Sequence, residues 1–202
     1  MTRTIGALVF PEFEMLDLYG PLEVFSFFPD HFTIRTVAPQ AGAVAASGGP
    51  DTVAADSLHS APAYDILLVP GGRGTRPLRE DAGFLRALAA AAGRAQIVAS
   101  VCTGALLLAK AGVLTGRRAT TNKLAFDWVA DQCPDVHWQA RARWVVDAHY
   151  YTSSGVSAGM DMALALIEDL EGPQMATNAA RYAEYIRNPD PDDDPFAVKE
   201  PT

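Results

Sequence analysis

The chain has 202 residues, of which 49% are hydrophobic and 20% charged, enough for one domain with a well-buried core. Its formal net charge of −8 would repel a phosphate backbone, which argues against a nucleic-acid partner. No apolar run approaches the roughly 18 residues needed to cross a bilayer, so we expect no membrane partner. The N-terminal apolar run lacks a small-residue cleavage site, which favours a cytoplasmic protein.

Cysteine, histidine and arginine positions exclude further classes of site. Cys102 and Cys133 lie far apart without CxxC spacing, which argues against a disulfide framework and a structural zinc site. The four histidines lack the i, i+4 spacing of a helical metal pair, so we expect no metal. Small basic clusters, such as Arg141 and Arg143, are expected to decorate the ends of strands and loops.

The first half of the chain alternates apolar runs with loops. Pro11 removes a backbone donor and ends the first apolar run. An irregular helix follows, with Gly20-Pro21 expected at its opening turn, where the fixed φ of proline is tolerated. A continuous apolar run that ends in a glycine pair is typical of a central parallel strand. The predicted strands are 4–10, 32–39 and 64–72, with a small hairpin within 43–57.

The second half continues this alternation of strand and helix patterns. Ser157 is the expected N-cap of a helix that ends at Gly172. The predicted helices are 76–94, 104–112, 122–133, 156–172 and 173–187, with a strand at 96–100 and two or three short strands in 136–155.

This order predicts an α/β fold, namely a flavodoxin-like, doubly wound and mostly parallel sheet with helices on both faces. We expect one domain over residues 1–188. Residues 189–202 are rich in proline and aspartate and are expected to form an acidic arm, extended or partly disordered.

Cys102 lies where the strand at 96–100 turns abruptly into a helix, as in a nucleophile elbow. Such a turn would hold the sulfur at the carboxyl edge of the sheet and near a helix N-terminus. The helix dipole would then lower the pKa of the thiol and favour the thiolate. The alternative is a buried cysteine that acts as a small hydrophobic residue.

Ligands of open α/β sheets bind at the carboxyl ends of the strands, so the loops there form the candidate site. Four motifs lie in or near these loops: LDLYGP with Asp17, PGG at 70–72, SVCTGA at 100–105 and ATTNK at 119–123. Together, in this order and spacing, they resemble the ThiJ/PfpI family of the class I glutamine amidotransferase-like superfamily. Within it they look most like isonitrile hydratases and the amidotransferase-like domains of AraC-type regulators.

The resemblance implies that Cys102 is the reactive residue and that Asp17 approaches its sulfur. The backbone N–H groups of Gly71, Gly72 and Thr103 are candidates for an anion-stabilising pocket, and the hydroxyl of Thr103 for a contact with substrate or thiolate. Many relatives have histidine where this chain has Asn122, and asparagine cannot accept the thiol proton. A Cys-His dyad at this position is therefore excluded, and Asn122 joins the glycines as a candidate substrate-binding residue.

Two classes of function follow from these residues. The first is a cofactor-free hydratase that adds water to an isocyanide, a small-molecule substrate, and yields an N-substituted formamide. The second is a redox-sensing or ligand-binding regulatory protein with an oxidisable Cys102. A glyoxalase-like, deglycase or amidase activity on small carbonyl compounds is weakened by Asn122. The resemblance also implies a homodimer.

Overall fold

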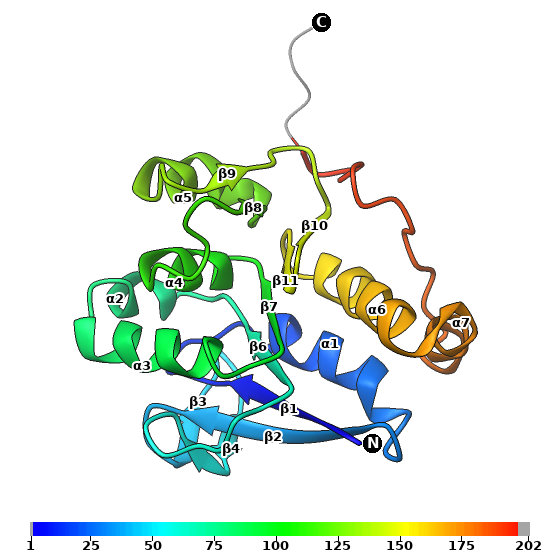
Figure 1. Ribbon diagram of the computed structural model, residues 1–202, viewed down its shortest axis with the longest axis horizontal. Helices are drawn as coiled ribbons and strands as arrows, with labels where there is room; N and C mark the ends of the chain where they lie inside the picture. The colour runs from blue at the N-terminus through cyan, green and yellow to red at the C-terminus, as the bar shows by residue number, and fades with distance from the viewer. Residues whose placement is uncertain (1, 198–202) are drawn as a thin grey trace, which may run out of the picture.

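The computed structural model describes residues 2–197, which fold around a central sheet (Figure 1). Within these residues the sheet has seven strands in the order β10-β11-β7-β6-β1-β2-β5. All neighbouring pairs are parallel except β10 with β11. The strands are β1 (Arg3–Leu8), β2 (Phe32–Ala38), β5 (Asp56–Ser57), β6 (Ile66–Val69), β7 (Ile97–Val101), β10 (Trp144–Asp147) and β11 (Tyr150–Ser153).

The predicted α/β class is confirmed. Taken in chain order, the five strands β2-β1-β6-β7-β11 have the order 2-1-3-4-5, which is that of flavodoxin-like folds. Every residue of β6 is buried, as its unbroken apolar sequence predicts for a central parallel strand. The expected hairpin also forms, as antiparallel β3 (Gly42–Ala45) and β4 (Asp51–Ala54), and a separate pair joins β8 (Arg118–Ala119) to β9 (His137–Trp138).

Helices cover both faces of the sheet, as Figure 1 shows. On one face α1 (Met15–Ser26) packs against α6 (Ala158–Glu171), which in turn packs against α7 (Pro173–Tyr182). On the other face lie α2 (Thr75–Leu78), α3 (Ala82–Ala92) and α4 (Gly104–Lys110). A short 3-10 helix, η1 (Lys123–Ala125), leads directly into α5 (Phe126–Gln132).

The position expected for Gly20-Pro21 is wrong. The helix begins at Met15, and Pro21 lies inside it rather than at its opening turn. Proline removes one intrahelical hydrogen bond, but buried side chains on both sides of it hold α1 against the sheet and α6. Those side chains are Leu18, Leu22, Val24 and Phe25. The earlier start adds a first turn, and this turn carries Asp17.

Two other helix boundaries differ from the expectation. The helix predicted over 76–94 is divided into α2 and α3, because Asp81 accepts hydrogen bonds from the backbone N–H groups of Gly83 and Phe84 and caps a new helix. Ser157 does occupy the N-cap position of α6, but its side chain makes no capping hydrogen bond.

Of the expected C-terminal arm, residues 189–197 fold back on the body of the protein near β10 (Figure 1). The carbonyl of Pro191 accepts hydrogen bonds from the N–H groups of Arg143 and Trp144, and the N–H of Asp194 donates to Arg141. Asp194 is buried. The part of the expected arm at 198–202 lies outside the described residues.

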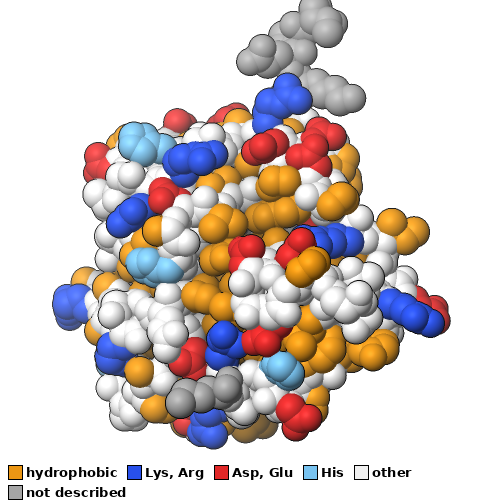
Figure 2. All heavy atoms as spheres, turned by 45° about the vertical axis from the view of Figure 1, so that its right-hand side comes forward, with side chains coloured by type: hydrophobic (Ala, Val, Ile, Leu, Met, Phe, Trp, Pro, Cys, Tyr) orange, Lys and Arg blue, Asp and Glu red, His pale blue; other side chains and the backbone are white. Residues whose placement is uncertain are grey.

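Arg143 lies directly before β10, as expected of a basic residue at the end of a strand, but it is buried rather than exposed. Its guanidinium is buried, 2.6 Å from Asp161 and 3.7 Å from Asp194. Elsewhere, Lys and Arg side chains on the face in Figure 2 are scattered among acidic and apolar ones. Within residues 2–197 no helix combines the length and the apolar character that a bilayer span requires.

Candidate active site

Cys102 follows β7 directly and has a left-handed backbone conformation, with φ of 57°. Such strain in a non-glycine residue is typical of nucleophile elbows. The turn is held on two sides: the N–H of Cys102 donates to the carbonyls of Ser153 and Ser154, and its carbonyl accepts from Thr121 Oγ1 at 2.8 Å. The predicted elbow is therefore present, and Thr121, at the centre of the ATTNK motif, is one of its supports.

Gly104 permits the close approach of this elbow to the neighbouring strand. A Cβ atom at this position would lie 2.2 Å from the carbonyl oxygen of Val69 and 2.8 Å from that of Pro70. Both contacts are with backbone, so no side chain can move aside to relieve them. Gly104, two residues after Cys102, thus lets α4 begin against the end of β6.

Asp17 reaches the same edge of the sheet from the first turn of α1. Its Oδ2 accepts a hydrogen bond from the N–H of Gly71 at 3.0 Å, and the residue is fully buried. Its Oδ1 is buried and has no nitrogen or oxygen hydrogen-bond partner among residues 2–197, while a side-chain hydrogen bond joins the carboxyl to Cys102. Burial, opposed by the hydrogen bonds, raises the pKa of the Asp17 carboxyl to about 7.

The expectation of an ionised thiol is wrong. Cys102 is only 8% exposed, and burial is the main cause that raises the pKa of its thiol well above the ordinary value. The charge of Asp17 raises that pKa further, while the backbone N–H of Thr103 lowers it by less. Because each group shifts the pKa of the other, the two titrate as a pair. A carboxylate beside a neutral thiol is the favoured singly charged form.

The role expected for the glycine N–H groups needs a similar correction. The N–H of Gly71 is held by Asp17, and the N–H of Gly72 donates to Thr103 Oγ1 at 3.1 Å. In this conformation neither is free to stabilise a substrate anion. They fix the two side chains instead: Thr103 Oγ1 is also 3.3 Å from Thr75 Oγ1, while the Thr103 N–H remains directed at the Cys102 sulfur.

A cavity of about 300 Å³ opens beside Cys102. Asn122 lines it, as expected of a substrate-binding residue, while its Oδ1 accepts from the N–H of Ala125 and caps η1. The predicted site residues Gly72, Cys102, Thr103 and Asn122 therefore meet at one cavity, with Asp17 behind them. Sequence reasoning missed the other lining residues, which are Glu14, Arg73, Arg76, Leu124, Ala125 and Val156.

The missed lining residues had only a weak signal in the sequence. Arg73 lies within the PGGRGT stretch that marks the end of β6, so its closeness to the site follows from that motif. Leu124 and Val156 carry no chemistry, and only the fold brings them to the cavity. No histidine lines the cavity within the described part of the chain. Nor do residues 2–197 gather three His, Cys, Asp or Glu side chains in the way that a metal ion requires.

Comparison of the whole chain with known proteins agrees with this arrangement of the Cys102 elbow, the buried acid and the cavity. The model of the DJ-1/PfpI family matches residues 3–169. The chain belongs to the DJ-1/PfpI family. Isonitrile hydratase from Pseudomonas putida is 36% identical over 208 residues, 98% of this chain and 87% of the hydratase. The ThiJ/PfpI resemblance is confirmed.

Other DJ-1/PfpI relatives differ in function. The crystal structure of a ThiJ/PfpI family protein from Pseudomonas syringae has a TM-score of 0.85 and 31% identity, covering 94% of this chain and 77% of that one. The HTH-type transcriptional regulator CdhR from Pseudomonas aeruginosa is 28% identical over 89% of this chain, which spans only 54% of the regulator. The DJ-1/PfpI domain thus occurs in enzymes and in regulators, and the site must distinguish them.

Proposed function

We propose that this protein is an isocyanide hydratase, which adds water to R–N≡C and releases the formamide R–NH–CHO. The observation that carries the proposal is the buried carboxyl of Asp17, which is hydrogen-bonded to the Cys102 side chain and whose Oδ1 has no nitrogen or oxygen partner within residues 2–197. An acid and a nucleophile suffice, because hydration of an isocyanide expels no amine. The 36% identity to an isonitrile hydratase supports the same reaction.

In the first step the sulfur of Cys102 attacks the terminal carbon of the isocyanide. Asp17 accepts the thiol proton as the S–C bond forms, and then delivers it to the same carbon, which carries the developing negative charge. The product is a covalent thioimidate, R–N=CH–S–Cys102. This step needs no thiolate in the resting protein, since the carboxylate of Asp17 removes the proton during the attack.

In the second step water adds to the thioimidate carbon. Asp17 accepts a proton from the water and transfers it to the imine nitrogen, which gives R–NH–CH(OH)–S–Cys102 and restores the Asp17 carboxylate. Collapse of this intermediate breaks the C–S bond, forms the formamide carbonyl and returns the hydroxyl proton to the sulfur. The cycle consumes one water and one isocyanide, and no further cofactor enters it. We also propose that the protein acts as a cytoplasmic homodimer.

Burial and the raised pKa of Cys102 favour this hydratase over a redox sensor. Oxidant-sensing cysteines are exposed and have a low pKa, because the thiolate is the species that reacts. A thiol that is 8% exposed meets neither condition. Amidase or glyoxalase chemistry would need another proton acceptor, and no histidine among the described residues lines the cavity.

The test is to follow the isocyanide stretching band in the infrared with purified protein and methyl isocyanide. We expect the band to disappear and N-methylformamide to form. Cys102→Ser should abolish turnover, while Cys133→Ser, which replaces a buried cysteine outside the cavity, should retain it. Absence of turnover across a series of alkyl isocyanides would refute the function, and an active Cys102→Ser would refute the mechanism.

A further inference from the structure

A second cavity, of about 320 Å³, lies beside the Cys102 cavity. Asn122, Leu124 and Val156 line both, so the two adjoin along these residues. Its volume is within the roughly 300–1,000 Å³ range of small-molecule sites. Resting on the hydratase function, we propose that this cavity binds the apolar N-substituent of the isocyanide and that Phe196, from the C-terminal arm, is its specificity-determining wall.

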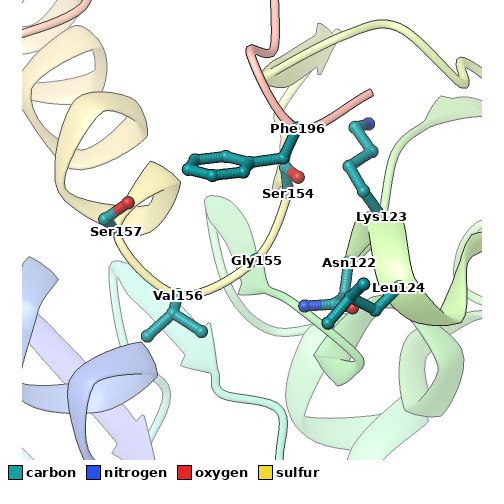
Figure 3. A pocket seen from close by; sticks show the side chains of 8 residues that line it. All are labelled: Asn122, Lys123, Leu124, Ser154, Gly155, Val156, Ser157 and Phe196. Atoms are coloured by element: carbon teal, nitrogen blue, oxygen red, sulfur yellow. The ribbon is translucent and has the colours of Figure 1, made fainter. Parts of the chain in front are cut away.

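The lining of the second cavity suits an uncharged, apolar group. Figure 3 shows the ring of Phe196 lying across the cavity and pointing toward Ser157, with Val156 and Leu124 on the other sides. The ammonium group of Lys123 is held by other residues, since its Nζ donates to Thr120 Oγ1 at 2.8 Å and to the carbonyl of Ala142 at 2.6 Å. What remains is carbon surface with two serine hydroxyls and an amide.

Leu124 and Phe196 are apolar yet exposed, at 100% and 71% respectively. While they are exposed to water, these side chains contribute little hydrophobic free energy. An apolar substituent held between them and Val156 would remove carbon surface from solvent on both sides. The position of the cavity fits this role. With the reacting carbon at Cys102, a substituent on the nitrogen extends away from the sulfur, and the cavity shared along Asn122, Leu124 and Val156 is the space beside it.

The arm that carries Phe196 is anchored rather than loosely draped. Asp194, with a side chain only 1% exposed, lies 3.7 Å from the guanidinium of Arg143, and its Oδ1 accepts the N–H of Phe196 at 2.9 Å. The N–H of Ala197 donates to the carbonyl of Asp194, which closes a turn around Phe196. The buried aspartate thus fixes the backbone from which the ring extends.

The test compares cyclohexyl isocyanide with methyl isocyanide as substrates. In Phe196→Ala we expect the ratio of kcat/KM for cyclohexyl over methyl isocyanide to fall by about tenfold, mainly through KM, because only the larger substituent reaches the ring. Phe196→Leu should restore most of the ratio, since leucine also provides an apolar wall. Asp194→Asn should lower the ratio in the same direction by weakening the anchor.

Ile186→Ala is the matched control, because Ile186 is 93% exposed and lines neither cavity. It should leave the substrate ratio and the activity as in the wild type. An unchanged ratio in Phe196→Ala, or an equal loss with both substrates that Phe196→Leu does not reverse, would overturn the assignment. Turnover of methyl isocyanide by the wild type reports on the hydratase function separately.

A binding measurement keeps the assignment testable without catalysis. We expect N-cyclohexylformamide to shift the methyl NMR signals of Leu124 and Val156 in the wild type, with affinity about tenfold weaker in Phe196→Ala. If the wild type hydrates no isocyanide but binds this formamide in a Phe196-dependent way, the reaction is refuted and the apolar subsite stands. If neither signal responds to the formamide, the subsite itself is refuted.

Discussion

At the scale of single residues, the site depends on how Asp17 and Cys102 share protons. The proposed reaction needs the pair to hold one proton fewer than its fully protonated form, because a carboxylate must receive the thiol proton. Burial has raised the pKa of Asp17 to about 7, so this form is lost as the pH falls below neutrality. The site is therefore adjusted to neutral pH by burying the acid rather than by ionising the thiol.

This sharing predicts the pH dependence of isocyanide hydration. We expect kcat/KM to rise about tenfold per pH unit below pH 7 and to level off above it, with an apparent pKa of about 7. Asp17→Asn cannot accept the proton and should lower kcat/KM by about 10²–10⁴-fold, with loss of this limb of the profile. Initial rates at constant ionic strength measure both. A profile in Asp17→Asn that keeps the wild-type limb would show that another group titrates.

The same buried acid reduces stability at neutral pH. Its pKa is about 7 in the fold against 3.8 as its ordinary value, so between these pH values the folded state binds more protons than the unfolded state. Stability is therefore highest below pH 3.8, as far as this group is concerned, and is lost as the pH rises to about 7. At pH 8 the loss amounts to about 4 kcal/mol.

Asp17→Asn should recover part of this free energy, since an amide oxygen still accepts the N–H of Gly71 and carries no charge. We expect Asp17→Asn to be more stable than the wild type at pH 8, and this advantage to shrink toward pH 4. Urea unfolding at the two pH values measures it. An advantage of the same size at both values would mean that the effect is not ionisation.

At the scale of elements, the site is formed where three elements end or begin together. β6 ends one residue before the glycine pair, β7 ends at the elbow, and α1 begins early enough to present Asp17. The start of α4 approaches the end of β6 closely, and Gly104 is the residue that permits it. The geometry of the nucleophile is therefore a property of how α4 packs, and not of Cys102 alone.

Gly104→Ala tests this packing. Its Cβ would lie 2.2 Å from the backbone oxygen of Val69, so α4 must shift, and we expect a loss of about 1–3 kcal/mol in stability together with a large loss of activity. Gly83→Ala is the matched control, because its nearest neighbour is the side-chain oxygen of Asp81 at 3.2 Å and alanine favours a helix. Thermal unfolding and hydration rates of both variants decide; a fully active Gly104→Ala would contradict the packing argument.

At the scale of the whole molecule, local sequence patterns predicted the strands and the elbow and marked the four motifs of the site, because each of these depends on residues that are neighbours in the chain. They failed where distant contacts decide. Pro21 looked like a helix start until the burial of its neighbours outweighed the missing hydrogen bond. The burial of Arg143 was not predicted, because its partners Asp161 and Asp194 lie far along the chain. The thiol looked ionised, because its depth in the fold is not visible in the sequence.

Asp161 connects segments of the chain that no sequence motif linked. Its Oδ2 lies 2.6 Å from Arg143 Nε, and its Oδ1 accepts from the Tyr185 hydroxyl at 3.1 Å and the Asn188 N–H at 3.0 Å. It therefore connects α6 to the segment before β10 and to the residues just before the C-terminal arm. Tyr185 is held closely enough for burial and then the charge of Asp161 to raise the pKa of its hydroxyl.

Asp161→Asn leaves a buried guanidinium with only the more distant Asp194 to balance it, so we expect a loss of about 3–5 kcal/mol in the free energy of unfolding. Glu168→Gln is the comparison, because the Arg187–Glu168 pair is partly exposed and should contribute about 1 kcal/mol or less. Urea unfolding ranks the two. Because Asp161 also holds the arm, native-state hydrogen exchange at the N–H of Asn188 should accelerate in Asp161→Asn and stay unchanged in Glu168→Gln. Equal losses of stability, with Asn188 still protected in Asp161→Asn, would show that the arm is held without the buried pair.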